Sequence, residues 1–64
     1  MKIKYDKQTD TLYIQLSNNP ISESGEDKNG VILDYDNQEN VVGIEILNAS
    51  AKLPIPNVVE YEMA

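Results

Sequence analysis

Aspartates and amides supply most of the side chains that could carry chemistry, and they gather in two short segments. Oxygen-bearing residues alternate at positions 6–10 (DKQTD) and again 30 residues later at positions 36–40 (DNQEN). Calcium takes carboxylate and carbonyl oxygens of this kind, but neither segment continues into the glycine and distal glutamate of an EF-hand loop. We therefore expect Asp6 and Asp36 to accept backbone N–H groups two residues further on and to stabilise turns. The sequence predicts no metal or cofactor site.

Catalysis has few side chains to use in this chain. Asp34 and Asp36 flank Tyr35, so in a strand both carboxylates would point to one face. A carboxylate pair can perform acid–base chemistry when its pKa values are separated. The chain has no cysteine and no histidine, which excludes Cys–His and Ser–His–Asp arrangements. We expect no catalytic residue and no enzymatic activity.

The elements that position these residues are two related hairpins. Segment 30–47 alternates apolar and polar residues around a polar turn, and segment 2–16 repeats the pattern at an offset of 30. In the first hairpin the alternation pairs Ile3 with Ile14 across a loop at 7–10. In the second it pairs Tyr35 with Val42 across a loop at 37–40. The prediction is a mainly β fold, a single antiparallel sheet of four to five strands built from two related hairpins, with a short C-terminal helical segment.

The segments between and after the hairpins are less regular. Residues 22–28 form either an edge strand or an acidic loop, and Asn29-Gly30 is typical of a type I′ turn. Asn48 is a candidate N-cap for one helical turn that the prolines after Leu53 would end. We therefore predict a β domain over residues 1–53. Residues 54–64 form a tail that is a strand, a short helix, or a segment ordered against a partner.

The two predicted hairpins differ on the face opposite their shared apolar side. In the second hairpin that face includes an apolar strip, which must be covered by the tail or by another subunit. The candidate interaction surface combines this strip with tail residues, namely Ile32, Val41, Leu47, Val58, Val59 and Tyr61. On the same face Tyr13 is expected to pack over the backbone exposed at Gly43.

Composition restricts the partners and the compartment. The formal charge of −6 opposes binding to nucleic-acid phosphates and to anionic membrane surfaces, so we expect neither partner. The chain has 64 residues and no disulfide or zinc ligands, and small domains of this kind often gain stability by oligomerising. A homo-oligomer or a small protein partner is therefore expected. The first residues lack the apolar core of a signal peptide, which predicts a cytoplasmic protein.

Three segments resemble a known family. They are YDKQTDTLYI at 5–14, GVILDYD at 30–36, and DYDNQENVVGIEIL at 34–47. Together they resemble the small bacterial and archaeal domain-of-unknown-function family numbered 2283, over about residues 2–53. The resemblance implies a compact, mostly antiparallel β domain, with no established activity, catalytic residue or cofactor. Some relatives are encoded beside small toxin-like proteins, so the resemblance suggests an antitoxin-like binding role. Nothing is carried over to the tail.

Taken together, these patterns predict a non-enzymatic protein-interaction or self-association module. Two alternatives remain open at this point. One is an antitoxin-like partner of a small toxin protein, and the other is a small-molecule or metal-binding domain that uses the two aspartate-lined loops.

Overall fold

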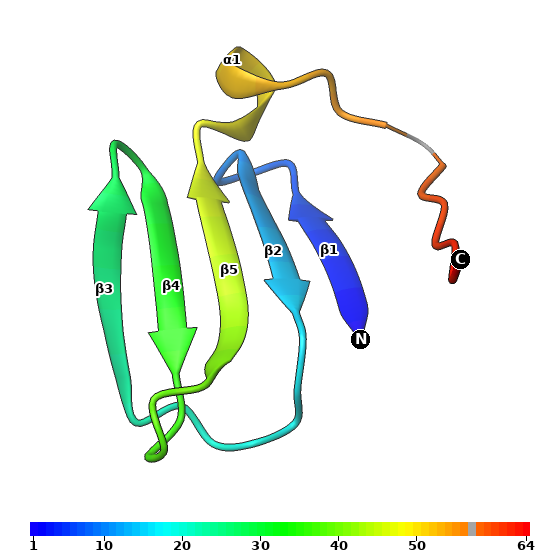
Figure 1. Cartoon of the computed structure of the whole chain (residues 1–64). Coiled ribbons are helices and arrows are strands. Elements are labelled where there is room, and N and C mark those ends of the chain that lie inside the picture. Colours follow the sequence, from blue (N-terminus) through cyan, green and yellow to red (C-terminus); the bar gives the residue numbers. More distant parts are fainter. Residues whose placement is uncertain (57) are drawn as a thin grey trace.

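A computed structural model describes residues 1–56 and 58–64, so Asn57 of the predicted tail lies outside the described residues. Five strands form one antiparallel sheet in the order β1-β2-β5-β4-β3 (Figure 1). The prediction of a mainly β fold with a short C-terminal helix is confirmed. The elements are β1 (Lys2–Asp6), β2 (Thr11–Gln15), β3 (Glu23–Lys28), β4 (Val31–Tyr35), β5 (Val41–Leu47) and α1 (Ala49–Lys52).

The first hairpin has the predicted register. Ile3 lies opposite Ile14 and Tyr5 opposite Leu12, with the loop at residues 7–10 between the strands. A slip of one residue would turn every apolar side chain of a strand to the other face, so the alternation fixes this pairing.

The second hairpin contains a bulge that the alternation does not predict. Leu33 pairs with Ile44 as expected, but Tyr35 pairs with Val41 instead of Val42. The predicted Tyr35–Val42 pair is therefore wrong. Val42 is the additional residue of a β-bulge; it is 2% exposed, and its carbonyl accepts the Leu16 N–H at 2.8 Å. The bulge thus fastens the end of β5 to the chain that leaves β2.

The two hairpins join through their second strands, β2 and β5. Ile14 pairs directly with Ile44, and these two residues occupy equivalent positions 30 apart in the repeat. Because the pairing is antiparallel, the hairpins are related by an approximate two-fold axis that runs through this pair, normal to the sheet. The axis places the β1–β2 loop and the β4–β5 loop at opposite ends of the sheet (Figure 1).

Residues 22–28, for which a strand and a loop were both open, contribute the edge strand β3. Every residue of β3 is exposed. The turn into β4 is not of type I′, because that type needs positive φ at both central residues and only Gly30 has it, at 75°. A register shift between Glu26 and Lys28 and a bond from the Gly30 N–H to the Glu26 carboxylate, at 2.9 Å, accompany this different turn.

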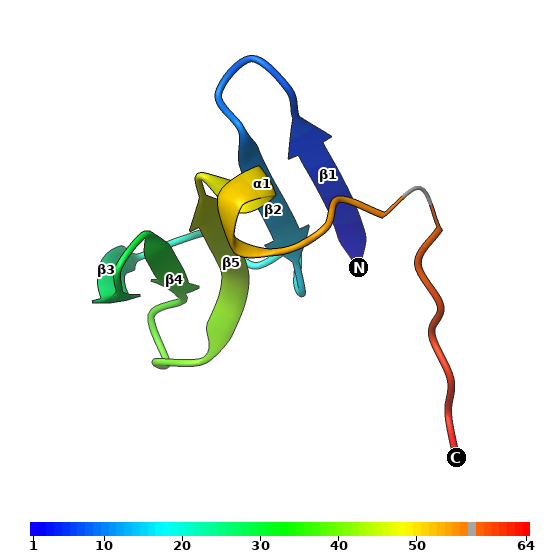
Figure 2. The same cartoon turned by 90° about the horizontal axis from the view of Figure 1, so that it is seen from above.

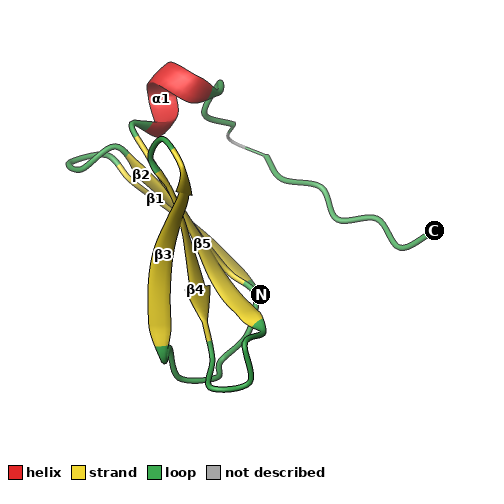
Figure 3. Ribbon diagram, turned by 60° about the vertical axis from the view of Figure 1, so that its left-hand side comes forward, coloured by secondary structure: helices red, strands yellow, loops and turns green. Residues whose placement is uncertain are grey.

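The sheet forms a single layer. Figure 3 shows the strands nearly edge-on, with α1 at one end and no second layer over either face among the described residues. Among the residues that the structure describes, only Val42 and Ala49 are buried apolar side chains. The described tail residues carry neither helix nor strand and run away from the sheet (Figure 2). In the described part of the chain, no helix has the length and apolar character needed to cross a membrane.

Candidate functional site

Two of the aspartates act in turns, as predicted. Asp6 accepts the Gln8 N–H at 2.9 Å, and Asp36 accepts the N–H groups of Gln38 at 2.8 Å and Asn40 at 2.9 Å. The Asn40 N–H is the main cause that lowers the pKa of Asp36, and the Gln38 N–H adds to it against an opposing effect of burial. These carboxylates hold the hairpin loops.

The two aspartate-lined loops do not form a common site. They lie at opposite ends of the sheet because the hairpins are related by the two-fold axis (Figure 1). Within each loop, the first aspartate is engaged with the amides of its own turn. A single ligand could therefore not contact both loops at once.

Asp10 has a structural role that the sequence did not reveal. Its carboxylate accepts bonds from the Ser50 N–H at 3.0 Å, the Ser50 hydroxyl at 2.7 Å and the Tyr5 hydroxyl at 2.6 Å. The Tyr5 hydroxyl is the largest cause that lowers the pKa of Asp10, followed by Ser50. Asn48 lies at the predicted N-cap position of α1, but its φ is 52° and its side chain makes no capping bond. Asp10 caps the helix from 40 residues away in sequence.

A buried carboxylate lies on the more polar face of the sheet. Asp34 is 1% exposed, and its Oδ1 accepts the Ser24 hydroxyl at 2.6 Å. Its Oδ2 is buried without a hydrogen-bond partner in the described structure. A Cβ on the facing Gly43 would lie 3.0 Å from this oxygen and 2.6 Å from the Tyr13 hydroxyl oxygen. The predicted packing of Tyr13 over Gly43 is therefore confirmed.

Two further titratable groups surround Asp34. Burial is the main cause that raises the pKa of Glu45, and the charge of the neighbouring Asp34 adds to the effect. Burial likewise raises the pKa of Tyr13, with smaller effects from Asp34 and Glu45. Tyr13 and Glu45 pair across β2 and β5, and they line a hollow of about 300 Å³ together with Lys4. The cluster is acidic and closely packed at the Gly43 backbone.

The opposite face, here called the aliphatic face, is formed by two rows of side chains that cross the four strands β1, β2, β5 and β4. The members of each row pair directly, and each is half-buried or exposed because no second layer of helices or strands among the described residues covers them. The first row is Ile3, Ile14, Ile44 and Leu33, and the second is Tyr5, Leu12, Ile46 and Val31.

The structure separates the residues of the predicted interaction surface. Ile32 and Leu47 are half-buried near one end of β5, whereas Val41 begins that strand and is 39% exposed. Six residues of a strand span about 20 Å, and Gly43 and Glu45 lie between. The tail residues Val58, Val59 and Tyr61 are exposed, and Val59 and Tyr61 line a hollow with residues of the aliphatic face instead.

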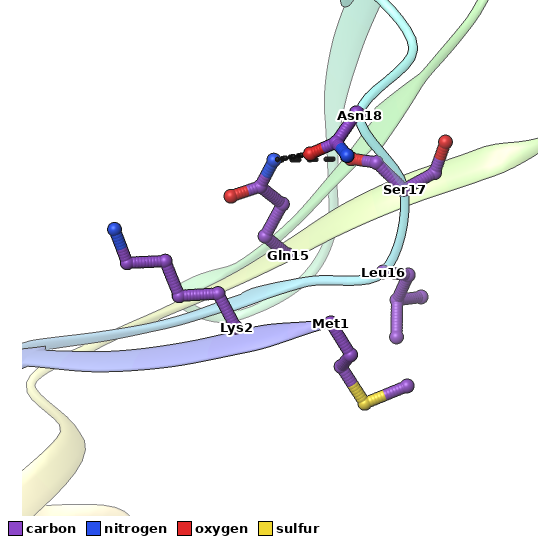
Figure 4. A pocket seen from close by; sticks show the side chains of 6 residues that line it. All are labelled: Met1, Lys2, Gln15, Leu16, Ser17 and Asn18. Atoms are coloured by element: carbon purple, nitrogen blue, oxygen red, sulfur yellow. Dashed lines mark hydrogen bonds between the residues drawn. The ribbon is translucent and has the colours of Figure 1, made fainter.

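A polar hollow of about 380 Å³ opens at the end of the first hairpin (Figure 4). Lys2 and Gln15 point to one side of the ribbon there, and Met1 and Leu16 point to the other. The Gln15 amide already donates to Asn18 Oδ1 at 2.9 Å. The groups that line this hollow therefore diverge, and they do not converge on a ligand.

Comparison with protein families agrees with the segments on which the resemblance rests. The model of DUF2283, a protein of unknown function, matches residues 2–50. The chain belongs to the DUF2283 family. No curated protein and no solved structure matches the chain. The DUF2283 match spans all five strands and both faces of the sheet, and it ends at Ser50, the residue that Asp10 holds. The tail lies beyond it.

Proposed function

We propose that this DUF2283 chain is a non-enzymatic self-association module, in which two copies pack their aliphatic faces together. The proposal rests above all on the exposed surface of the chain. A compact monomer of 7.2 kDa would expose about 4,100 Å², whereas this chain exposes 5159 Å². The surplus of about 1,000 Å² is shared between the uncovered aliphatic face and the exposed tail, and in total it is comparable to the roughly 800 Å² that each partner buries in a stable interface.

The aliphatic face has the chemistry of a sheet-packing surface. Its two rows contain aliphatic side chains and one tyrosine, and the charged residues of the four strands belong to the other face. Sheets stacked face to face lie about 10 Å apart and interdigitate such side chains. A single layer of this size contains few buried apolar groups, so the second copy would provide the missing half of the core.

Two exposed residues allow a test that leaves the monomer fold intact. Ile3 belongs to the aliphatic face, and Leu16 follows β2 and points to the same side of the sheet (Figure 4). Ile3 is 40% exposed and Leu16 is 36% exposed, so the double variant Ile3→Glu/Leu16→Glu should fold. The control adds the same charge at exposed loop positions, Gln8→Glu/Gln38→Glu. Analytical ultracentrifugation should give a dimer for the wild type and the control, and a monomer for the face variant.

The outcome can also contradict the proposal. A wild-type chain that sediments at its 7.2 kDa monomer mass up to millimolar concentration would reject self-association. A face variant that dimerises as tightly as the control would show that the aliphatic face is not the interface. Circular dichroism of both variants confirms that any loss of dimer is not a loss of fold.

A further inference from the structure

The outer edge of β1 has no neighbouring strand in the part of the chain that the structure describes. Among the described strands β1 pairs only with β2, so alternate backbone N–H and C=O groups of β1 point outward. Such an edge is a template for a strand from another chain.

The internal repeat predicts what is missing at this edge. The approximate two-fold axis through the Ile14–Ile44 pair places β4 on β1 and β5 on β2. It therefore places β3, which pairs with the outer edge of β4, on the outer edge of β1. A sixth strand on the outer edge of β1 would therefore complete the two-fold symmetry of this five-stranded sheet.

The C-terminal segment 59–63 has the pattern that this position requires. In β1, Lys2 and Lys4 alternate with Ile3 and Tyr5, and in the tail VEYEM alternates apolar residues with two glutamates. An antiparallel pairing that sets Glu60 opposite Lys4 places both glutamates beside the lysines and the apolar residues beside the aliphatic face. Opposite charges across neighbouring strands are stabilising.

The other strands that a second copy could offer fit this edge less well. A second β1 would bring lysines opposite lysines, which is unfavourable. The segment of β3, ESGEDK, has no apolar residue to lie beside Ile3 and Tyr5. The tail is the segment of this chain that complements both the charge and the apolar pattern of β1.

The position of the tail favours a second copy as its source. Val59 and Tyr61 line a hollow of about 620 Å³ with Ile3 and Ile14, so the tail leaves its own sheet on the aliphatic side. Figures 2 and 3 show that it then continues away from the sheet and out of the plane of β1. Tyr61 is 76% exposed and Met63 is 81% exposed. A partner packed on the aliphatic face lies on the side toward which the tail extends.

We infer that residues 59–63 of one chain pair with the outer edge of β1 in a second chain, so that two chains exchange C-terminal strands. This inference rests on the proposed self-association and specifies how the two copies are fastened. The exchanged strand completes the six-stranded sheet of each partner and covers the edge that would otherwise promote aggregation.

Charge exchange tests the pairing in the full chain. The variant Glu60→Lys/Glu62→Lys should weaken the dimer about tenfold or more, because attractive cross-strand pairs become repulsive. Adding Lys2→Glu/Lys4→Glu to the same chain should restore the wild-type dissociation constant. The control Glu23→Lys/Asp27→Lys makes the same charge change on the exposed strand β3 and should not weaken the dimer.

Cross-linking identifies the source of the strand. The chain has no cysteine, so Lys4→Cys and Glu60→Cys can be made in separate chains, mixed and oxidised. Directly paired strand residues have Cα atoms about 4.5–5.5 Å apart, which permits a disulfide. The mixed chains should form the cross-link readily, whereas Lys4→Cys mixed with Gln38→Cys should not.

Two results would overturn the inference. If the mixed chains stay uncross-linked while a Lys4→Cys/Glu60→Cys double variant closes on itself, the tail pairs with its own β1. If neither reaction occurs, the tail does not pair with β1. In both cases a dimer that the aliphatic-face variant disrupts would leave the proposed function intact, and a monomeric wild type would reject both proposals.

Discussion

Substituting Gly43 by alanine directly tests the packing of the polar face. The new Cβ would lie 2.6 Å from the Tyr13 hydroxyl oxygen, 3.1 Å from Tyr13 Cζ and 3.0 Å from Asp34 Oδ2. Asp34 is buried and its other oxygen is held by Ser24, and the tyrosine ring is rigid, so neither neighbour moves away at low cost. Overpacking of this kind costs about 1–3 kcal/mol.

A smaller gain partly offsets this cost. Alanine is favoured over glycine within a strand by about 0.5–1 kcal/mol, so the net loss for Gly43→Ala is about 0–2.5 kcal/mol, with a central value of about 1 kcal/mol. For a domain of this size 1 kcal/mol corresponds to about 4–8 °C in Tm. The matched control is Gly25→Ala, because Gly25 also lies in a strand and a Cβ there meets nothing within 4 Å. The control should raise Tm by a few degrees.

Thermal denaturation followed by circular dichroism, at one fixed chain concentration, measures both changes. Tyr13→Phe removes the oxygen that lies nearest the new Cβ, so Tyr13→Phe/Gly43→Ala should recover about half of the loss seen relative to Tyr13→Phe alone. The reasoning would be refuted if Gly43→Ala were as stable as Gly25→Ala. It would also be refuted if removing the hydroxyl brought no recovery.

Three further predictions concern the carboxylates. Asp10→Ala should make the Ser50 amide exchange with solvent at least about tenfold faster, as measured by NMR, because the helix loses its cap. In the Asp34→Asn variant, the pKa of Glu45, followed by 13C NMR, should fall only part of the way back toward its ordinary value of 4.5. Burial is the larger cause of the raised pKa and stays in place. The raised pKa of Glu45 contributes stability that is present below pH 4.5 and is lost as the pH rises through the pKa of Glu45 in the folded chain. The lowered pKa values of Asp10 and Asp36 contribute stability that is present above 3.8 and lost as pH falls through their folded values. Tm should therefore be highest between about pH 3.8 and pH 4.5. Glu45→Gln should remove the fall of Tm above this range and leave the fall below it unchanged.

The sequence predicts this fold well where the signals are local and periodic. Alternation with a period of two and a polar loop of fixed length determine the register of the first hairpin, and the repeat predicts the second. The bulge at Val42 is not visible in this way, because one additional residue preserves the composition of the segment. Only its partners Leu16 and Ser17, in the segment that follows β2, explain it. The turn at Gly30 likewise depends on a shift in the neighbouring edge strand.

Contacts between distant parts of the chain, and the exposure of each face of the sheet, are harder to predict from the sequence. The capping of α1 by Asp10 joins residues 40 apart, and no short motif marks it. The apolar alternation predicts which side chains share a face, yet it does not say whether a second layer covers that face. The alternation alone is typical of a face buried in an ordinary core, whereas the structure leaves the aliphatic face half-exposed.

The two-fold relation also explains why the two halves of the polar face differ. Tyr13 and Gly43 are equivalent positions in the repeat, and each adjoins the Ile14–Ile44 pair on the axis. Two large side chains at these positions would meet across the axis. One copy therefore carries tyrosine and the other carries glycine, and the ring of the first fills the space above the second.

The two copies of the repeat also carry opposite charges at equivalent positions of the polar face. The position that is Asp34 in the second copy is Lys4 in the first. Asp34 is covered by β3, which supplies the Ser24 hydroxyl that its carboxylate binds. Lys4 lies on β1, and no described strand covers it in the equivalent way. A strand that pairs with the outer edge of β1 must place a favourable partner beside Lys4, as β3 does beside Asp34. The alternating glutamates of the tail provide the opposite charge that Lys4 requires.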